Sequence, residues 1–125
     1  MTILDTSVLI DSLSGPKRSA RALRAAIEQG ERIVLPSLVL YEWLRGPRST
    51  LEIAAQEALF PADGAVVFGP REALLSAELY RSVKRPRGRE IDLAIAACAI
   101  VRNADLWTLN SADFRDIPQI RLVAF

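Results

Sequence analysis

The chain has 125 residues, half of them apolar, which is enough for one compact domain and too few for two. We therefore expect a single domain over residues 1–125. The formal net charge of +1 excludes a strongly basic protein that binds polyanions through its overall charge, and no apolar run is long enough to cross a bilayer. The protein is expected to make no contact with a membrane.

The chain contains no histidine and a single cysteine, Cys98. The lack of histidine removes the commonest general acid and base and a principal zinc ligand, which excludes the Ser-His and Cys-His hydrolases. Cys98 lies in the apolar run LAIAACAIV, so it is expected to be a core residue rather than a reactive thiol. With no disulfide and no export signal, the expected location is cytoplasmic. Catalysis would have to use carboxylates, hydroxyls or a metal ion held by oxygen.

Short β-type runs alternate with helical patterns along the chain. Strands are predicted for residues 2–5, 32–36, 65–68, 105–109 and 121–124. Helices are predicted for residues 6–13, 18–29, 38–45, 51–59, 71–84 and 90–103, with a short helical turn from Ser111. Gly30 is placed to end the second helix and Ser37 to cap the third. This alternation predicts the α/β class, with a mostly parallel central sheet of four to five strands flanked by helices.

Basic residues gather in two short segments. The first contains Lys17, Arg18, Arg21 and Arg24, and the second contains Arg81, Lys84, Arg85, Arg87 and Arg89. Runs of this kind are usually solvated surfaces, so by themselves they do not indicate nucleic-acid binding.

Two acidic residues stand next to predicted helix starts. Asp5 follows an apolar strand and precedes a helix, so a capping role is sufficient to explain it. Asp92 lies in the first turn of a helix, where acids are favoured. That helix is apolar almost all round from Leu93 to Val101, so Asp92 is expected to be partly buried and to need a partner or a cation.

Two further acids also allow two interpretations. Glu42 interrupts the apolar stretch LVLYEWL, where it is either a carboxylate facing the core or a solvated partner of Arg45. Asn110 and Asp113 form the pattern N-x-x-D, which is similar to a helix capping box. Each acid has a structural explanation of its own, so only their joint arrangement indicates a site.

Four segments follow one another along the chain: TILDTSVLID, LPSLVLYEWLRG, EIDLAIAACAI and LWTLNSADF. Together they resemble the PIN-domain ribonucleases, and especially the VapC-type toxins of bacterial toxin–antitoxin pairs. The resemblance spans nearly the whole chain and implies a PIN-like fold. It implies that the catalytic and metal-binding residues are the four acids Asp5, Glu42, Asp92 and Asp113. It also implies that the site is completed by the auxiliary residues Thr6, Ser7, Thr108 and Asn110.

The resemblance implies a metal-dependent ribonuclease that leaves 5′-phosphate and 3′-hydroxyl ends. Carboxylates about 4 Å apart repel one another by roughly 4 kcal/mol per pair at an effective dielectric constant of 20, so a cluster of them requires a cation. Oxygen ligands without histidine favour Mg²⁺ or Mn²⁺. Arginines near the acids, namely Arg45, Arg87 and Arg89, are predicted to contact the RNA backbone.

The same resemblance implies an RNA substrate, a small VapB-type antitoxin as partner, and a homodimer. A haloacid-dehalogenase-like phosphatase would also place an aspartate after its first strand, but it needs a second aspartate where this chain has Ser7. The remaining alternative is a catalytically inert PIN-like module that binds RNA or protein. The presence of all four acids argues against that alternative.

Overall fold

The computed structural model describes residues 1–123, and a four-stranded sheet lies at its centre. The strands are β1 (Thr2–Leu4), β2 (Ile33–Val34), β3 (Asp105–Trp107) and β4 (Leu122–Val123). Their order across the sheet is β2-β1-β3-β4, and all three neighbouring pairs are parallel. The expected α/β architecture with a parallel sheet of four to five strands is confirmed. Residue 124, the end of the predicted closing strand, lies outside the described residues.

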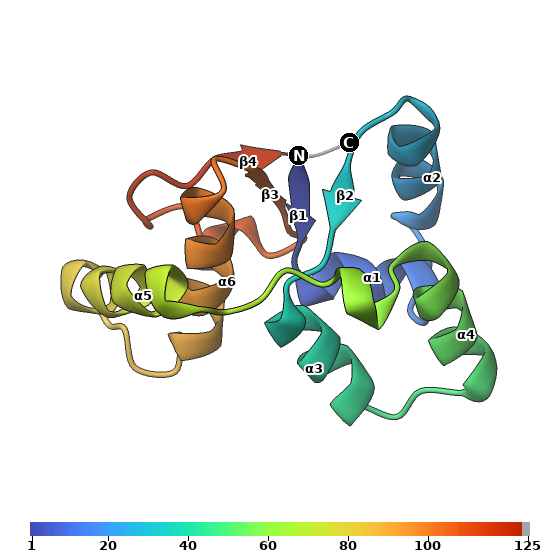
Figure 1. The fold of residues 1–125 in the computed structure, drawn as a ribbon, viewed down its shortest axis with the longest axis horizontal. Helices are drawn as coiled ribbons and strands as arrows, with labels where there is room; N and C mark the ends of the chain where they lie inside the picture. Colours follow the sequence, from blue (N-terminus) through green and yellow to red (C-terminus); the bar gives the residue numbers. More distant parts are fainter. Residues whose placement is uncertain (124–125) are drawn as a thin grey trace.

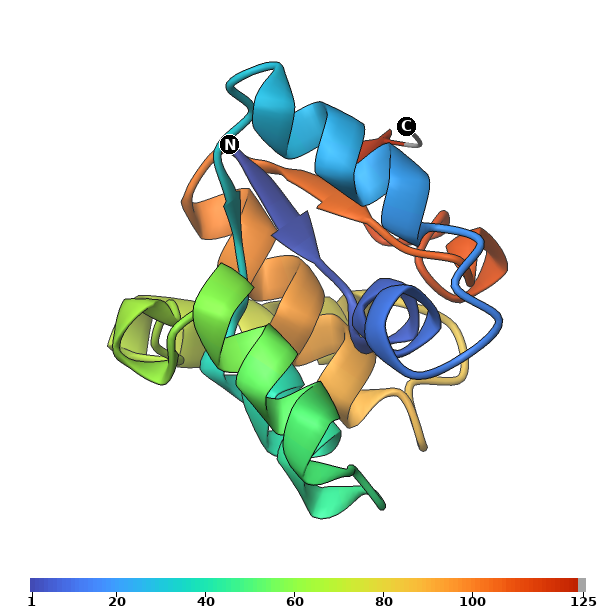
Figure 2. The ribbon, with the colours of Figure 1, turned by 90° about the vertical axis from the view of Figure 1, so that its right-hand side faces the viewer.

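The helices are α1 (Thr6–Leu13), α2 (Ala20–Glu28), α3 (Ser37–Arg45), α4 (Thr50–Leu59), α5 (Pro70–Ser82) and α6 (Glu90–Val101). They lie on both sides of the sheet, with α5 outside α6 (Figure 1). All six predicted helices are present, and their ends differ from the prediction by one or two residues at most. The sheet lies between α6 and α2 (Figures 1 and 2). Within residues 1–123 no helix is both long and apolar enough to cross a bilayer.

The strand predicted for residues 65–68 does not form. Only Val66 pairs with the sheet edge: its amide donates to the Leu35 carbonyl and its carbonyl accepts from the Ser37 amide, both at 2.8 Å. The segment beside it cannot extend this pairing, because Pro36 has no amide hydrogen and α3 begins at Ser37. The apolar run AVVF therefore forms a single bridge instead of a strand.

Helix ends follow local capping rules at several points. Ser49 and Glu52 form a reciprocal capping box at the start of α4, with Glu52 Oε1 accepting from the Ser49 amide at 2.7 Å. Gly30 adopts a φ of 88° just after α2, as expected for a glycine that ends a helix. The prediction that Ser37 caps α3 is wrong, because Pro36 occupies the cap position and Ser37 is the first helical residue.

Helix α6 forms the centre of the core. Its residues from Leu93 to Ala99 are all buried, which matches a helix that is apolar on every side. Cys98 is fully buried there, and burial raises the pKa of its thiol to about 11. The expectation that Cys98 is an inert core residue is thus confirmed. Because the strands are parallel, β1 and β3 end at the same edge of the sheet, and this edge carries the site.

Candidate active site

Asp5 directly follows β1 and is only 4% exposed. It occupies the cap position of α1, but its side chain makes no capping hydrogen bond. Instead, its Oδ2 atom accepts hydrogen bonds from two hydroxyls, Ser7 Oγ at 2.8 Å and Thr108 Oγ1 at 2.7 Å. Both hydroxyls bind the same oxygen, so neither engages Oδ1. The capping explanation for Asp5 is therefore not supported.

The two hydroxyls also hold the chain that follows β3. Ser7 Oγ accepts from the Leu109 amide and Thr108 Oγ1 accepts from the Asn110 amide, each at 3.0 Å. Parallel pairing makes this possible, because Leu4 is in register with Trp107 and the next residue of each strand extends past the same edge. The ends of β1 and β3 are thereby joined by side chains as well as by the sheet.

Glu42 reaches the same region from α3. Its Oε1 accepts a hydrogen bond from Thr6 Oγ1 at 2.5 Å, and Arg45 Nη2 lies 3.5 Å from its Oε2. The side chain of Glu42 is 20% exposed. Both sequence interpretations of Glu42 are thus realised together: it contacts the start of α1 on one side and a solvated arginine on the other.

Asp92 lies in the first turn of α6 and is half-buried. Its carboxylate makes no hydrogen bond or ion pair with any residue of the described chain. Burial raises the pKa of Asp92 to about 6, with further upward contributions from the charges of Asp5, Asp113 and Glu42 and a smaller opposing one from Arg89. Three carboxylates from other segments are therefore close enough to act on Asp92.

Asp113 is exposed and lies on a single 3₁₀ turn, η2 (Ser111–Asp113). Asn110 occupies the cap position of this turn, but its side chain makes no capping bond, so the predicted capping box is wrong. The turn is closed by the backbone alone, with the Asp113 amide donating to the Asn110 carbonyl at 2.9 Å. Asp113 is thus free of the structural role that its sequence pattern suggested.

The four acids approach one another without yet forming a ready metal shell. Within residues 1–123, no three of these carboxylates are arranged as ligands around one point. Glu42 is turned toward Thr6 and Arg45, and Oδ2 of Asp5 is occupied by hydroxyls. The candidate ligands are the carboxylates and the neighbouring hydroxyls, with no histidine in the chain and Cys98 buried in the core, so the site offers oxygen ligands to a hard cation.

The three arginines proposed for RNA contact differ in their surroundings. Arg45 is 56% exposed, pairs with Glu42 and lies 5.2 Å from the centre of the Tyr41 ring. Arg87 is exposed in the loop before α6. Arg89, in contrast, is only 20% exposed and binds the carboxylate of Asp116, a contact that the sequence could not reveal because the two residues are 27 positions apart.

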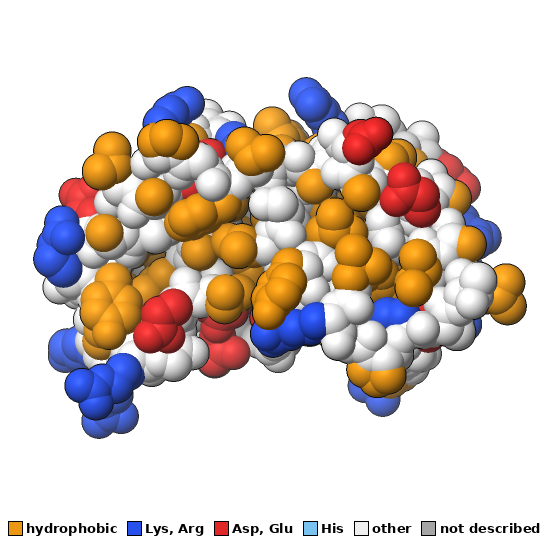
Figure 3. Space-filling model, turned by 60° about the horizontal axis from the view of Figure 1, so that its bottom comes forward, with side chains coloured by type: hydrophobic (Ala, Val, Ile, Leu, Met, Phe, Trp, Pro, Cys, Tyr) orange, Lys and Arg blue, Asp and Glu red, His pale blue; other side chains and the backbone are white. Residues whose placement is uncertain are grey.

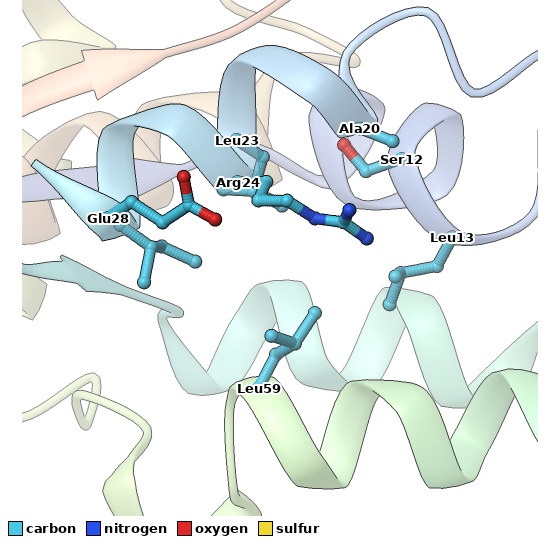
Figure 4. A pocket seen from close by; sticks show the side chains of 8 residues that line it. Ser12, Leu13, Ala20, Leu23, Arg24, Glu28 and Leu59 are labelled. Carbon is cyan, nitrogen blue, oxygen red and sulfur yellow. The ribbon is translucent and has the colours of Figure 1, made fainter.

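A pocket of about 320 Å³ lies between α1, α2 and α4 and includes none of the four acids. Figure 4 shows Leu59 pointing from α4 toward α2, while the side chains of Leu13 and Arg24 extend into the space between the helices. Ser12 lies in its wall, and its hydroxyl is buried without a hydrogen-bond partner in the described chain. Figure 3 shows that hydrophobic side chains also gather across another face, at the bottom of Figure 1, beside acidic and basic groups.

Comparison with known proteins identifies the relatives of this chain. The PIN domain family matches residues 2–120. Ribonuclease VapC19 of two strains of Mycobacterium tuberculosis is 36% identical over 124 residues, which cover 97% of this chain and 98% of that protein.

Solved structures show the same fold at lower identity. The DNA-bound VapBC of Salmonella typhimurium matches with a TM-score of 0.74 and 23% identity, over 98% of this chain and 96% of the matched chain. VapBC2 of Rickettsia felis, bound to a DNA fragment from its promoter, matches with a TM-score of 0.73 and 19% identity, over 99% and 98% of the two chains. By family match and by sequence identity, the chain belongs to the PIN-domain family and is related to its VapC members.

Proposed function

We propose that this chain is a divalent-metal-dependent endoribonuclease and acts as the toxin of a VapBC-type toxin–antitoxin pair. The observation that carries the proposal is the approach of Asp5, Glu42 and Asp113 to Asp92 at the edge where β1 and β3 end; burial, together with the charges of these three acids, raises the pKa of Asp92 to about 6. These acids come from four separate segments of the chain. Carboxylates gathered in this way are unfavourable unless a cation binds among them.

The residues present fit Mg²⁺ or Mn²⁺. The site offers only oxygen ligands, there is no histidine in the chain, and Cys98 is buried in the core. Asp92 is half-buried without a hydrogen-bond partner among residues 1–123, which is costly for a bare carboxylate. Asp5, Glu42, Asp92 and Asp113 would hold the ion, once Glu42 turns away from Arg45. The hydroxyls of Thr6, Ser7 and Thr108, together with Asn110, would orient these ligands.

The proposed reaction is hydrolysis of an RNA phosphodiester. A water oxygen attacks phosphorus, the bond from phosphorus to the 3′ oxygen breaks, and a proton passes to that oxygen, which leaves 5′-phosphate and 3′-hydroxyl ends. A bound divalent ion supplies positive charge opposite the phosphate and activates the water. Asp92 or Asp113 orients the water as a carboxylate. Arg45, which pairs with Glu42, and Arg87, exposed in the loop before α6, bind the phosphate backbone.

We further propose that a VapB-type antitoxin binds this chain. The similarity to Ribonuclease VapC19 and the VapBC complexes among the structural neighbours support this partner. The pocket between α1, α2 and α4 is the proposed contact, because most of the residues that line it are apolar. A peptide segment carrying apolar side chains would fill it.

The hydrophobic side chains on the face shown in Figure 3 support the predicted homodimer. A toxin that cleaves cellular RNA would act in the cytoplasm. Size-exclusion chromatography with light scattering checks the dimer, and a monomer at micromolar concentration would contradict it.

The decisive experiment is an RNA cleavage assay with the purified chain. We expect cleavage with Mg²⁺ or Mn²⁺, no cleavage in chelator, and loss of at least a hundredfold in rate for Asp5→Asn, since this variant keeps the shape of the side chain but removes a ligand charge. Analysis of the product ends should show 5′-phosphates.

The matched control is Asp63→Asn, which changes the same residue type on an exposed turn away from the site. It should cleave at the rate of the unchanged protein. If RNA binds but is never cleaved with any divalent ion, the inert binding module is correct instead.

A further inference from the structure

Arg89 lies at the N-terminal end of α6, three residues before Asp92, and its side chain reaches the segment that follows η2. Its guanidinium makes two parallel hydrogen bonds with the carboxylate of Asp116. Nη1 donates to Oδ2 at 3.0 Å and Nη2 donates to Oδ1 at 2.6 Å. Two-pronged pairs of this kind fix orientation as well as distance.

The same guanidinium also binds two backbone carbonyls. Nη2 donates to the carbonyl oxygen of Asp113 at 3.0 Å, and Nη1 donates to that of Lys84 at 3.2 Å. Arg89 therefore connects three parts of the chain: the loop after α5, the start of α6 and the turn that carries Asp113. We call the contact between Arg89, Asp116 and the Asp113 carbonyl the arginine clamp.

The clamp acts on a short segment that has no long helix or strand of its own. Asp113 is exposed, and the buried side chains of Phe114 and Ile117 fix the following residues to the core. Arg89 fixes the same segment to α6. Because Arg89 binds the carbonyl of Asp113 itself, losing its side chain would remove one of the contacts that hold the backbone carrying the Asp113 carboxylate.

We propose that Arg89 is a positioning residue that, paired with Asp116, holds Asp113 beside Asp92. The inference rests on the proposed function, in which these two acids serve the same divalent ion. It replaces the RNA contact predicted for Arg89 from the sequence. The guanidinium is directed at oxygens of its own chain and its charge is balanced by Asp116, whereas Arg87 is exposed and retains the predicted RNA contact.

The test measures Mn²⁺ affinity by electron paramagnetic resonance on the full chain, with RNA affinity measured separately in chelator. Arg89→Gln, Arg89→Lys and Asp116→Ala should each weaken Mn²⁺ binding about tenfold or more, as expected when a group that orients metal ligands is lost. Lysine keeps the charge but cannot make the two-pronged contact. The double variant R89Q/D116A should bind Mn²⁺ no more weakly than R89Q alone, because Asp116 acts only through Arg89. Turnover should fall while the KM for RNA stays the same.

The matched control is the ion pair between Arg121 and Asp105, at the opposite end of the sheet. In this pair Arg121 Nε lies 2.9 Å from Asp105 Oδ1. R121Q and D105N should leave Mn²⁺ affinity unchanged. Circular dichroism checks that each variant is folded. If R89Q does not fold, D116A tests the inference in its place, because the Asp116 side chain is 48% exposed and its loss should not prevent folding.

Two results would overturn the inference in different ways. If D116A binds Mn²⁺ as tightly as the unchanged protein while R89Q weakens RNA binding and lowers its salt dependence, Arg89 contacts RNA and the clamp has no positioning role. If the unchanged protein binds no Mn²⁺ at all, the proposed metal-dependent function fails and the inference fails with it.

Discussion

The carboxyl group of Asp92 is surrounded by apolar helix residues on one side and by other acids on the other. Burial and the charges of Asp5, Asp113 and Glu42 raise its pKa from 3.8 to about 6. In the unfolded chain the group ionises near its ordinary value. Between these two pH values the folded protein holds more protons than the unfolded one, so the free energy of unfolding falls as the pH rises from about 4 to about 6. Above about pH 6, Asp92 is ionised in the folded protein, and this partly buried charge lowers the free energy of unfolding by its full amount.

Replacing Asp92 by Asn should therefore stabilise the metal-free protein at neutral pH. We expect D92N to raise the free energy of unfolding by about 1–2 kcal/mol at pH 7, a range reduced from the full pKa shift because the group is partly solvated. At pH 4 the gain should vanish, since Asp92 is then protonated in the folded state. Urea unfolding at both pH values measures the effect, with D63N as the control. Equal gains at pH 4 and pH 7 would contradict this explanation.

At the scale of elements, α5 and α6 are joined by a buried ion pair. Arg102 Nη1 lies 2.8 Å from Glu72 Oε2, and the Glu72 side chain is 7% exposed. The other carboxylate oxygen of Glu72 accepts a hydrogen bond from the Gly69 amide at 3.2 Å. Glu72 therefore caps the N-terminus of α5 and also pairs with Arg102 at the end of α6. This contact keeps α5 against the helix that carries Asp92.

Breaking this pair from one side should be costly. We expect Glu72→Gln to lower the free energy of unfolding by about 1–3 kcal/mol, because it removes the negative charge that pairs with Arg102, which is partly exposed and keeps its hydrogen bonds to two backbone carbonyls. Glu78→Gln, on an exposed position of the same helix, should change it by less than about 0.5 kcal/mol. Urea unfolding distinguishes the two variants, and equal losses would show that the ion pair contributes nothing specific.

The elements that the sequence predicts well are those with a strong local pattern. Apolar spacing and helix ends identify all six helices, and the β-type runs identify the four strands. The failure at residues 65–68 has a non-local cause, because Pro36 and the start of α3 decide how far the partner can pair. The capping box at Asn110 failed for a similar reason, since Thr108 and Ser7 already hold that loop.

The same distinction applies to the candidate site. The resemblance to PIN-domain ribonucleases named the four acids, and the structure brings their charges together around Asp92. Their roles as metal ligands stay predictions, as does the organisation of residues 1–125 as one domain. The partner of Arg89 could not be found from the sequence, because no pattern links residues that far apart. Side-chain contacts across the chain are specified only by the folded arrangement.

For the molecule as a whole, the proposed metal site would make metal binding and folding depend on each other. A ligand that binds only the folded state stabilises it by an amount set by its concentration and affinity. We expect Mn²⁺ at one hundred times its Kd to raise the free energy of unfolding by about 2.7 kcal/mol at pH 7. Asp5→Asn should remove most of this gain. Calorimetric melting with and without Mn²⁺ measures it, and an equal gain in the variant or with NaCl would contradict a specific site.

The joining of the β1 and β3 ends has a consequence for the synthesis of the protein. Asp5 emerges from the ribosome early, but its hydroxyl partner Thr108 and the turn with Asp113 are made more than one hundred residues later. A nascent chain that has not reached this point has no complete site. In the proposed function, a growing polypeptide therefore cleaves no RNA until this last part of the chain has been made.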